Sequence, residues 1–436
     1  MIGGVQNIGR ITELRQRILF TFAMLAVYRV GAFVVTPGID PDVVGRFFEQ
    51  LEGTVFGLFN LFSGGALEQL SIFSLGIMPY ISASIILQLL TVVIPQLEQI
   101  KKEGEQGRKK LNQYTRYATV GLAIFQGLLI ATALESGQFG EGAVLNGGWG
   151  FRLMCMITLT TGTCFLMWLG EQITERGIGN GISMIIFASI IIGLPGAMTQ
   201  LFQLVRTDQF SLVQVLFLLL FAVAVIGLVV VVERGQRRIP IQHARRVVGR
   251  RVQQGGMSYF PLRVNTAGVI PAIFASSLLM FPLTIGQFTD SPGVQQFIDQ
   301  YLDPASVVYQ FFYISLIIFF CYFYTAIMID PVDVADNIKR SGAFIPGIRP
   351  GKKTAEHIDR VLTRVTLIGA LYMSAVCVLP TLLAVRADVP FYFGGTALLI
   401  VVGVGLDTMA QIEAHLVSRQ YEGFAEGTRI RGRLSR

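Results

Sequence analysis

The residue types that most often carry enzyme chemistry are sparse in this chain and do not gather. The three histidines, His243, His357 and His415, form neither an HExxH pattern nor a close cluster, so no metal centre is expected. The segment GIRPGKKT at 347–354 resembles a phosphate-binding loop, but three residues rather than four separate its glycines, and no predicted strand precedes it. No Ser–His–Asp constellation is supported either. We therefore predict that the chain is not an enzyme and needs no cofactor.

Apolar residues are arranged in blocks of about 20, the length that crosses the hydrocarbon core of a membrane as a helix. The chain of 436 residues is 52% hydrophobic and only 14% charged, whereas soluble domains carry about 25% charged residues. The runs are continuous rather than alternating, which excludes a closed barrel. We predict ten spanning helices, at about 18–36, 72–95, 117–134, 153–170, 181–202, 212–232, 265–285, 307–329, 361–384 and 392–414.

The basic residues are distributed unevenly between the two sides of these spans. With both termini in the cytoplasm, the inner segments hold 30 of the 35 Lys and Arg residues, and the outer segments hold four. Positive charge accumulates on the cytoplasmic side of membrane proteins. The asymmetry therefore favours cytoplasmic termini and an even number of spans.

Charges within the spans are rare. Arg29 and Asp407 lie within or near spans, and the long Arg29 side chain can reach the interface. An ion-coupled transporter would more often carry buried acidic or lysine residues at mid-span. This scarcity disfavours a solute transporter, which is the alternative function.

Isoleucines stand out in the spans instead. Ile77 and Ile81, and likewise Ile182 and Ile186, lie four residues apart, so each pair shares one helix face. Packing or lipid contact is the common explanation of such a pattern. The alternative is a hydrophobic constriction that blocks water and ions by dewetting.

Residues 55–95 are too long for one span, because 41 residues of helix would extend about 60 Å. Glu68 is the only charge, and Gly64, Gly65 and Gly76 offer breaks in the helix. One crossing leaves spare apolar residues on the outer side. They form either an interfacial helix or a re-entrant half-helix, and a re-entrant piece implies a cavity around it.

Two inner loops, 233–264 and 330–360, are large and basic. RRIPIQHARRVVGRRV in the first predicts a protruding hairpin, while Pro346, Gly347, Pro350 and Gly351 in the second predict tight turns around Arg349. Ordinary solvated loops that fix topology are one explanation. A partner with a negative surface, either ribosomal RNA phosphate or an acidic protein face, is the other.

Several long stretches resemble the SecY family of protein-export channels, and they occur in the family's order. They are LFSGGALEQLSIFSLGIMPYISASIILQLLTVV, GEQITERGIGNGISMIIFASI, VERGQRRI, LRVNTAGVIPAIFASSLL, ADNIKRSGAFIPGIRPGKKTAEHIDRVLTR and PFYFGGTALLIVVGVGLDTMAQI. The outer loops and 286–306 carry no recognisable motif. The resemblance covers most of the chain and adds the following expectations.

The resemblance implies an all-α polytopic fold, in which two pseudo-symmetric inverted halves surround an hourglass pore. The implied parts are an amphipathic N-terminus at 1–17, a first half at 18–202 with a re-entrant plug half-helix at about 56–70, an external connection at 203–211, a second half at 212–414, and a C-terminal tail at 415–436. The implied function is a protein-conducting channel that moves unfolded secretory chains across the bacterial inner membrane and releases hydrophobic segments into it.

The resemblance also assigns residues, by matching its motifs position by position. It implies a pore ring of Ile77, Ile81, Ile182, Ile186, Ile273 and Ile400, a plug containing Phe59, Phe62, Gly64, Gly65 and Leu67, and a lateral gate with Gln88, Gln126 and Asn265. Partner-binding residues would be Arg349, Arg245, Arg246, Arg250, Arg251, Lys352 and Lys353. The implied partners are the SecE and SecG subunits, the SecA motor ATPase, the ribosome, signal sequences and membrane lipid.

Overall fold

The computed structural model describes residues 12–50, 60, 63–137, 140, 142–207, 211–243, 246–248, 251–253, 256–287, 296, 301, 306–387 and 395–427. The chain divides into two compact units. The first comprises Met1–Gln200 and Val404–Arg436, and the second comprises Leu201–Gly403. The unit boundaries fall within α9 (Gly181–Arg206) and α16 (Gly395–Gly427).

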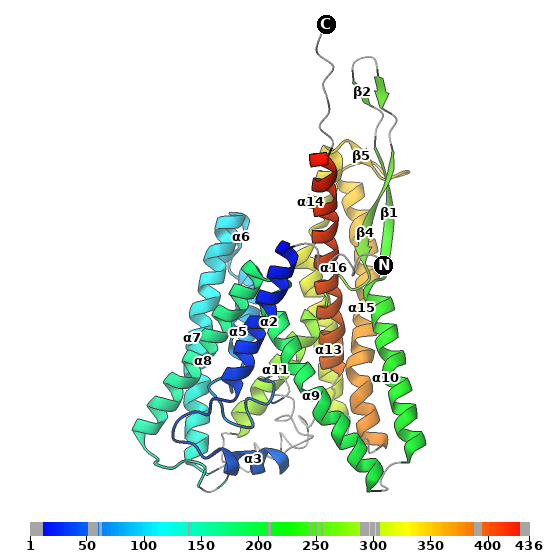
Figure 1. The fold of residues 1–436 in the computed structure, drawn as a ribbon. Helices are drawn as coiled ribbons and strands as arrows, with labels where there is room; N and C mark the ends of the chain where they lie inside the picture. Colours follow the sequence, from blue (N-terminus) through cyan, green and yellow to red (C-terminus); the bar gives the residue numbers. More distant parts are fainter. Residues whose placement is uncertain are drawn as a thin grey trace. The chain divides into compact units, whose positions relative to one another are not determined.

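The first unit is built around long helices (Figure 1). Besides α9 and α16, they are α2 (Thr12–Ala32), α3 (Pro41–Gln50), α5 (Met78–Val93), α6 (Pro95–Lys102), α7 (Glu105–Glu135) and α8 (Trp149–Arg176). Helices α7 and α8 lie side by side, and ion pairs join them at both ends. Arg116 Nε lies 2.7 Å from Glu171 Oε1 at one end, and Arg152 pairs with Glu135 at the other.

A proline separates α5 from α6. Pro95 occupies the first turn of α6, and Ile94 before it has an extended backbone with φ −99° and ψ 114°. A residue that precedes proline is disfavoured in the helical region, so the chain cannot continue as one helix. The two helices bend by 99° at this point.

The second unit contains α10 (Leu212–Glu233), α11 (Ile270–Gln287), α13 (Val307–Met328), α14 (Pro331–Arg340) and α15 (Lys352–Ala387). The start of α10 is fixed by a capping box, in which the Ser211 hydroxyl accepts from the Gln214 backbone and the Gln214 side chain accepts from the Ser211 backbone. Such reciprocal bonds satisfy amides that have no partner within the helix.

A helix lies in each of the ten ranges predicted to span. Among the described residues, six helices are long and apolar enough to cross a membrane, or seven if the bent pair α5–α6 counts as one span. Gly181–Gly196 and Ile270–Leu279 are shorter apolar helices. The chain is therefore a mostly helical, multi-pass membrane protein, and the count of ten remains a prediction.

Five short strands lie between the helices of the second unit. The predicted hairpin is confirmed, because β1 (Gln236–His243) pairs antiparallel with β4 (Met257–Arg263), and β2 (Arg246–Val248) pairs with β3 (Arg251–Gln253) further along the same hairpin (Figure 1). An unpredicted strand, β5 (Ala343–Phe344), adds to the other edge of β1 at Gln242 and His243.

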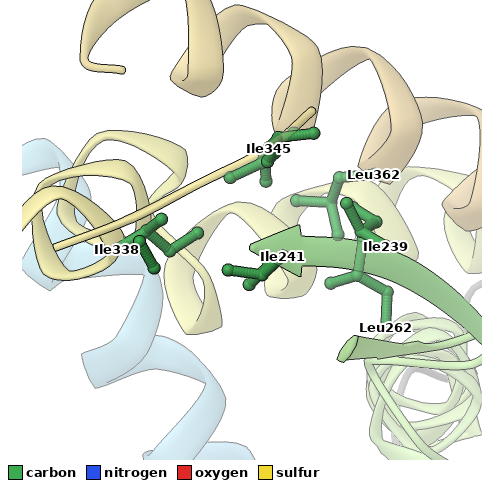
Figure 2. Packing of buried hydrophobic residues seen from close by; sticks show 8 residues of the cluster. Ile239, Ile241, Leu262, Ile338, Ile345 and Leu362 are labelled. Carbon is green, nitrogen blue, oxygen red and sulfur yellow. The ribbon is translucent and has the colours of Figure 1, made fainter. Parts of the chain in front are cut away.

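The three-stranded sheet has its own hydrophobic core, which Figure 2 shows from close by. Ile239 and Ile241 alternate along β1 with exposed neighbours, as expected for a strand with one buried face. They meet residues from β4, α14, the segment after β5, and α15; the further buried members are Leu262, Ile338, Ala343, Ile345, Ile358 and Leu362. We call this body the strand module. Loops 233–264 and 330–360, predicted as separate segments, are thus packed together.

We expect replacement of Ile358 by alanine to loosen the strand module. Ile358 is fully buried in its core, and Ile→Ala changes at such sites cost about 2–5 kcal/mol. Hydrogen exchange in the intact protein should show faster exchange of the β1 and β4 amides. Ile368→Ala is the matched control, because Ile368 lies on the same helix and is 60% exposed. Unchanged protection in Ile358→Ala would contradict this account of what holds the strands.

Candidate pore and closing segment

Residues Ser63–Ile77, which we call the turn segment, do not continue α5 as a helix. Gly64, Gly65 and Gly76 have φ values of 67°, 81° and 56°, a left-handed conformation that glycine adopts without steric cost. Leu70, with φ 39°, is the only non-glycine residue with a positive φ in the described part of the chain. The predicted second span, which began at residue 72, therefore starts as a helix only at Met78.

Hydrogen bonds within the turn segment and Asn60 make it a compact body. The Asn60 amide donates to Glu68 Oε2 at 3.0 Å and its Oδ1 accepts from the Glu68 backbone at 3.2 Å. Ser63 Oγ accepts from Leu67 N and donates to Asn60 O. Further along, Ser71 N donates to Ala66 O at 2.9 Å. The one carboxylate of this apolar region is thus hydrogen-bonded inside the body.

Two groups of bonds tie the turn segment to its neighbours in the first unit. At one end, the Tyr28 hydroxyl lies 2.8 Å from Ser63 O and 2.6 Å from Ser189 Oγ, while Arg29 Nη1 donates to Gly64 O at 2.9 Å. At the other end the bonds are between backbones. Thr36 N donates to Leu70 O, and Ile72 N donates to Val34 O, both at 2.9 Å.

Aromatic packing and close approach of the backbone complete the attachment. The Phe73 ring stacks on Tyr28, with centroids 6.0 Å apart, and on Phe165, with centroids 5.9 Å apart. A Cβ atom at Gly31 would overlap the Phe73 ring, and one at Gly162 would overlap the Ile72 carbonyl. Glycine at these two positions lets α2 and α8 contact the segment directly.

The turn between α8 and α9 fixes the start of α9. Its amides are paired with side chains: Ile178 N donates to Thr21 Oγ1 at 3.0 Å, Gly179 N to Gln411 Oε1 at 2.9 Å, and Gly181 N to Thr174 Oγ1 at 2.8 Å. A Cβ atom at Gly181 would overlap the Gly170 backbone. The Gly-rich motif GIGNG at 177–181 is therefore a packed turn.

The six isoleucines assigned to the ring lie on four helices. Ile77 immediately precedes α5 and Ile81 is in its first turn; both are 7% exposed. Ile182 is half-buried and Ile186 is buried in the first turns of α9. These four belong to the first unit. Ile273, half-buried in the first turn of α11, and Ile400, buried in α16, belong to the second unit. A closed ring of all six remains a prediction.

Comparison with known proteins identifies this arrangement. The sequence model of the SecY family matches residues 71–409. The chain belongs to the SecY family. It is 52% identical to the protein translocase subunit SecY of Pseudomonas aeruginosa and to that of Escherichia coli K12, over 97% of this chain and 96% of each relative. The Aquifex aeolicus relative is 44% identical over 95% of this chain and 97% of its own length.

Solved structures share the fold at low sequence identity. One described as the structure of a protein conducting channel has a TM-score of 0.63 at 19% identity, and covers 93% of both chains. A second, whose subject is the SecY plug domain that stabilises the closed channel and maintains a membrane seal, has a TM-score of 0.64 at 19% identity, again over 93% of both chains. The predicted family and the predicted channel architecture are confirmed.

The residues predicted to form a plug are only partly described. Gly64, Gly65 and Leu67 lie in the turn segment, and Leu67 is buried. Phe59 and Phe62, like most of the predicted half-helix at 56–70, lie outside the described residues.

The residues assigned to a lateral gate divide between the two units. Gln88 Nε2 on α5 donates to Ser84 Oγ at 3.2 Å, and Gln126 is half-buried on α7. Asn265 is buried in the second unit, where its amide donates to Glu233 Oε1 at 2.7 Å and to Gly268 O at 3.0 Å. Asn265 therefore ties the end of α10 to the start of α11, and its role in a gate remains a prediction.

The Arg349 side chain is exposed on a loop whose shape depends on hydrogen bonds to its backbone carbonyls. Thr354 Oγ1 donates to Arg349 O at 3.0 Å, and Ile348 N donates to Ile345 O at 3.1 Å. Lys352 and Lys353 are exposed beside it, and Lys353 pairs with Glu356 at 2.9 Å. Of the hairpin arginines, Arg246 and Arg251 lie on β2 and β3, whereas Arg245 and Arg250 fall outside the described residues.

The sequence did not identify the contacts of Tyr28, Arg29 and Ser189. Arg29 was expected to reach the membrane interface, yet its guanidinium binds the Gly64 carbonyl and lies over the Phe33 ring, 4.3 Å from the centroid. The available signal was an arginine inside an apolar helix. Such residues usually mark function, but only the fold shows that its partner lies 35 residues away.

Proposed function

We propose that this SecY chain is the channel-forming subunit of a bacterial protein translocase. It moves unfolded secretory polypeptides across the cytoplasmic membrane and releases hydrophobic segments laterally into the lipid. The observation that carries this proposal is the turn segment, a non-helical body held among the helices of a multi-pass chain. Backbone of this kind is tolerated at membrane depth only where protein or a cavity surrounds it. Relatives over nearly the whole chain are named protein translocase subunits.

The proposed architecture assigns residues 18–202 and 212–414 to two inverted halves around the pore, joined outside the cell by 203–211. Residues from about 56 to 70, which include the turn segment as far as Leu70, are the plug that closes the pore from outside. The relative described by its plug domain supports this assignment, because that plug stabilises a closed channel.

The six isoleucines would form the narrowest part of the pore. Their branched aliphatic side chains exclude water by dewetting. They also offer no hydrogen bonds to a passing chain. The isoleucines would therefore fit closely around an extended polypeptide without retaining it.

A signal sequence carries an apolar stretch of 7–15 residues. It would enter at the lateral gate, near Gln88, Gln126 and Asn265, because lipid lies on one side of the gate and the pore on the other. Its binding would stabilise the open state and release the plug.

The strand module would be the docking surface for soluble partners. We propose the SecA motor and the ribosome as those partners, and SecE and SecG as membrane subunits. Exposed Arg349, Lys352 and Lys353, together with the basic hairpin at 245–251, suit a phosphate-rich or acidic surface. Relatives of the same fold are described in complex with ribosomes, with TM-scores of 0.57 and 0.63 at 16% identity. We also propose that both termini are cytoplasmic and that the chain lies in the inner membrane, so that this surface faces the cytoplasm, where such soluble partners are found.

A solute transporter is the alternative, and the contacts disfavour it. Among the described residues, Arg29 within α2 binds a carbonyl of the turn segment, and Glu68 is bonded to Asn60. Both charges therefore serve the structure of the turn segment and do not form an ion path of the kind a coupled transporter needs.

Crosslinking tests the proposed channel. A secretory chain stalled during export should crosslink to single cysteines placed at Ile77, Ile81, Ile182, Ile186, Ile273 and Ile400. Cysteine at Ile86, which lies on α5 and is 46% exposed, is the matched control and should remain unreacted. Equal crosslinking at Ile86 and at the six positions would contradict a central pore lined by them.

A further inference from the structure

The turn segment is bonded more densely within itself than to its surroundings. Asn60, Ser63, Glu68 and Ser74 all bond inside the body. Bonds of this kind move with the body, so they do not oppose its displacement as a unit. What opposes displacement is the set of bonds that cross its boundary.

The bonds that cross the boundary differ at the two ends. The backbone pairs at Leu70 and Ile72 lie close to α5, to which the segment is covalently joined. These backbone pairs lie beside Leu70 and Gly76, which have positive φ values. If the turn segment were displaced while still attached to α5, it would rotate about this region. The bonds at Ser63 and Gly64 lie at the far end of the turn segment, and there the partners are side chains, those of Tyr28 and Arg29 on α2.

Three features show that this side-chain contact is closely fitted. Tyr28 is 2% exposed, and its hydroxyl also meets Ser189 Oγ of α9, so the buried group has two partners. The Gly64 carbonyl receives a charged donor, which makes a stronger hydrogen bond than a neutral one. A Cβ atom at Gly64 would lie 3.0 Å from the Tyr28 hydroxyl and 3.1 Å from Ser189 Cα, so the backbone fits there only as glycine.

We propose that Tyr28 and Arg29, with Ser189, form a latch that holds the plug at Ser63 and Gly64, and that opening the channel breaks these bonds. The inference rests on the proposed function, because it assigns the closing role to the turn segment. It adds that the closed state is set by hydrogen bonds from one turn of α2 to the carbonyls of Ser63 and Gly64.

The latch predicts the effect of two single substitutions on resting ion conductance. The translocase is reconstituted with its partner subunits in planar bilayers, and KCl conductance is measured without substrate. Arg29→Met removes the charged donor and should raise conductance about tenfold or more, as expected for loss of one charge-assisted hydrogen bond. Tyr28→Phe keeps the ring that stacks on Phe73 but loses the hydroxyl, and should raise conductance by a smaller factor.

The matched control is Arg46→Met. Arg46 on α3 also donates to a backbone carbonyl, that of Asp42 at 3.1 Å, but it is exposed and its acceptor lies on its own helix. Its conductance should equal that of the unmodified chain. Hydrogen exchange of the α7 and α8 amides, measured on every variant, verifies that the helices around the segment remain folded.

A deletion of residues 60–67 separates failure of the latch from failure of the proposed function. With this deletion, conductance should rise, and adding Arg29→Met should then change nothing, because the partner of Arg29 is absent. If the deletion raises conductance but folded Arg29→Met and Tyr28→Phe behave like the unmodified chain, the latch is wrong and the plug stands. If the deletion itself leaves conductance unchanged, the turn segment is not a plug, and the latch falls with it.

Discussion

Serine at both Ile77 and Ile182 should make the resting channel leak ions. The double substitution removes two branched side chains from the proposed constriction and introduces hydroxyls that hold water, so the dewetting barrier falls. Each side chain contributes about 1.5–3 kcal/mol of apolar burial. Lowering a barrier by about 1.4 kcal/mol increases a rate tenfold. We therefore expect conductance to rise about tenfold to a hundredfold in planar bilayers.

The control for this leak is Ile86→Ser. Ile86 is on the same helix as Ile81, but 46% of it is exposed, so the substitution should leave the conductance unaltered. Ile77 is buried and Ile182 is half-buried, and thermal stability in detergent must therefore confirm that the double variant is folded. A folded double variant with normal conductance would show that these isoleucines pack the helices and do not line a constriction.

Reversing the charge of Arg349 should strongly impair motor-driven export without changing the folding or abundance of the protein. The side chain is exposed, and the loop keeps its shape through the Arg349 carbonyl, which accepts from Thr354. Arg349→Glu should therefore leave insertion and abundance of the protein in the membrane unchanged. At the partner interface, disrupting a close charge pair costs about 2–5 kcal/mol, which corresponds to at least about a tenfold loss of export.

Export into inverted membrane vesicles with purified motor would measure the effect of Arg349→Glu. Arg340→Glu is the matched control, because Arg340 is also exposed on the strand module, at the end of α14. If both reversals reduce export equally, the effect comes from the general positive field of this surface and not from Arg349. Normal export in Arg349→Glu would remove its proposed role.

Hydrophobic blocks and turn residues were enough to locate the helices. Each predicted span contains a helix because about 20 apolar residues in sequence have few other ways to satisfy their backbone in a membrane. The hairpin at 236–263 was equally readable from its β-branched and basic pattern. The helix boundaries were predicted less accurately. α5 starts at Met78 because Gly76 has a left-handed backbone conformation, which the number of apolar residues does not reveal.

Contacts between distant residues could not be predicted in the same way. The pairing of β1 with Ala343 and Phe344 involves only two residues of the second strand, too few for a periodic signal. Tyr28 and Ser189 are 161 positions apart, and nothing in either local sequence indicates the other. The family resemblance implied a ring and a plug, but it indicated none of the hydrogen bonds of Tyr28, Arg29 and Ser189.

The common core of the strand module has a mechanical consequence. α15 extends from Lys352 to Ala387, with its one proline, Pro380, near the far end, and its first turns carry Ile358 and Leu362 into that core. Tilting β1 alone would expose Ile239 and Ile241 to water. A force applied to the hairpin should therefore move β1 and α15 together, and so act on the apolar part of α15. A soluble partner that pulls on the hairpin would therefore also displace α15, whose apolar part lies within the membrane.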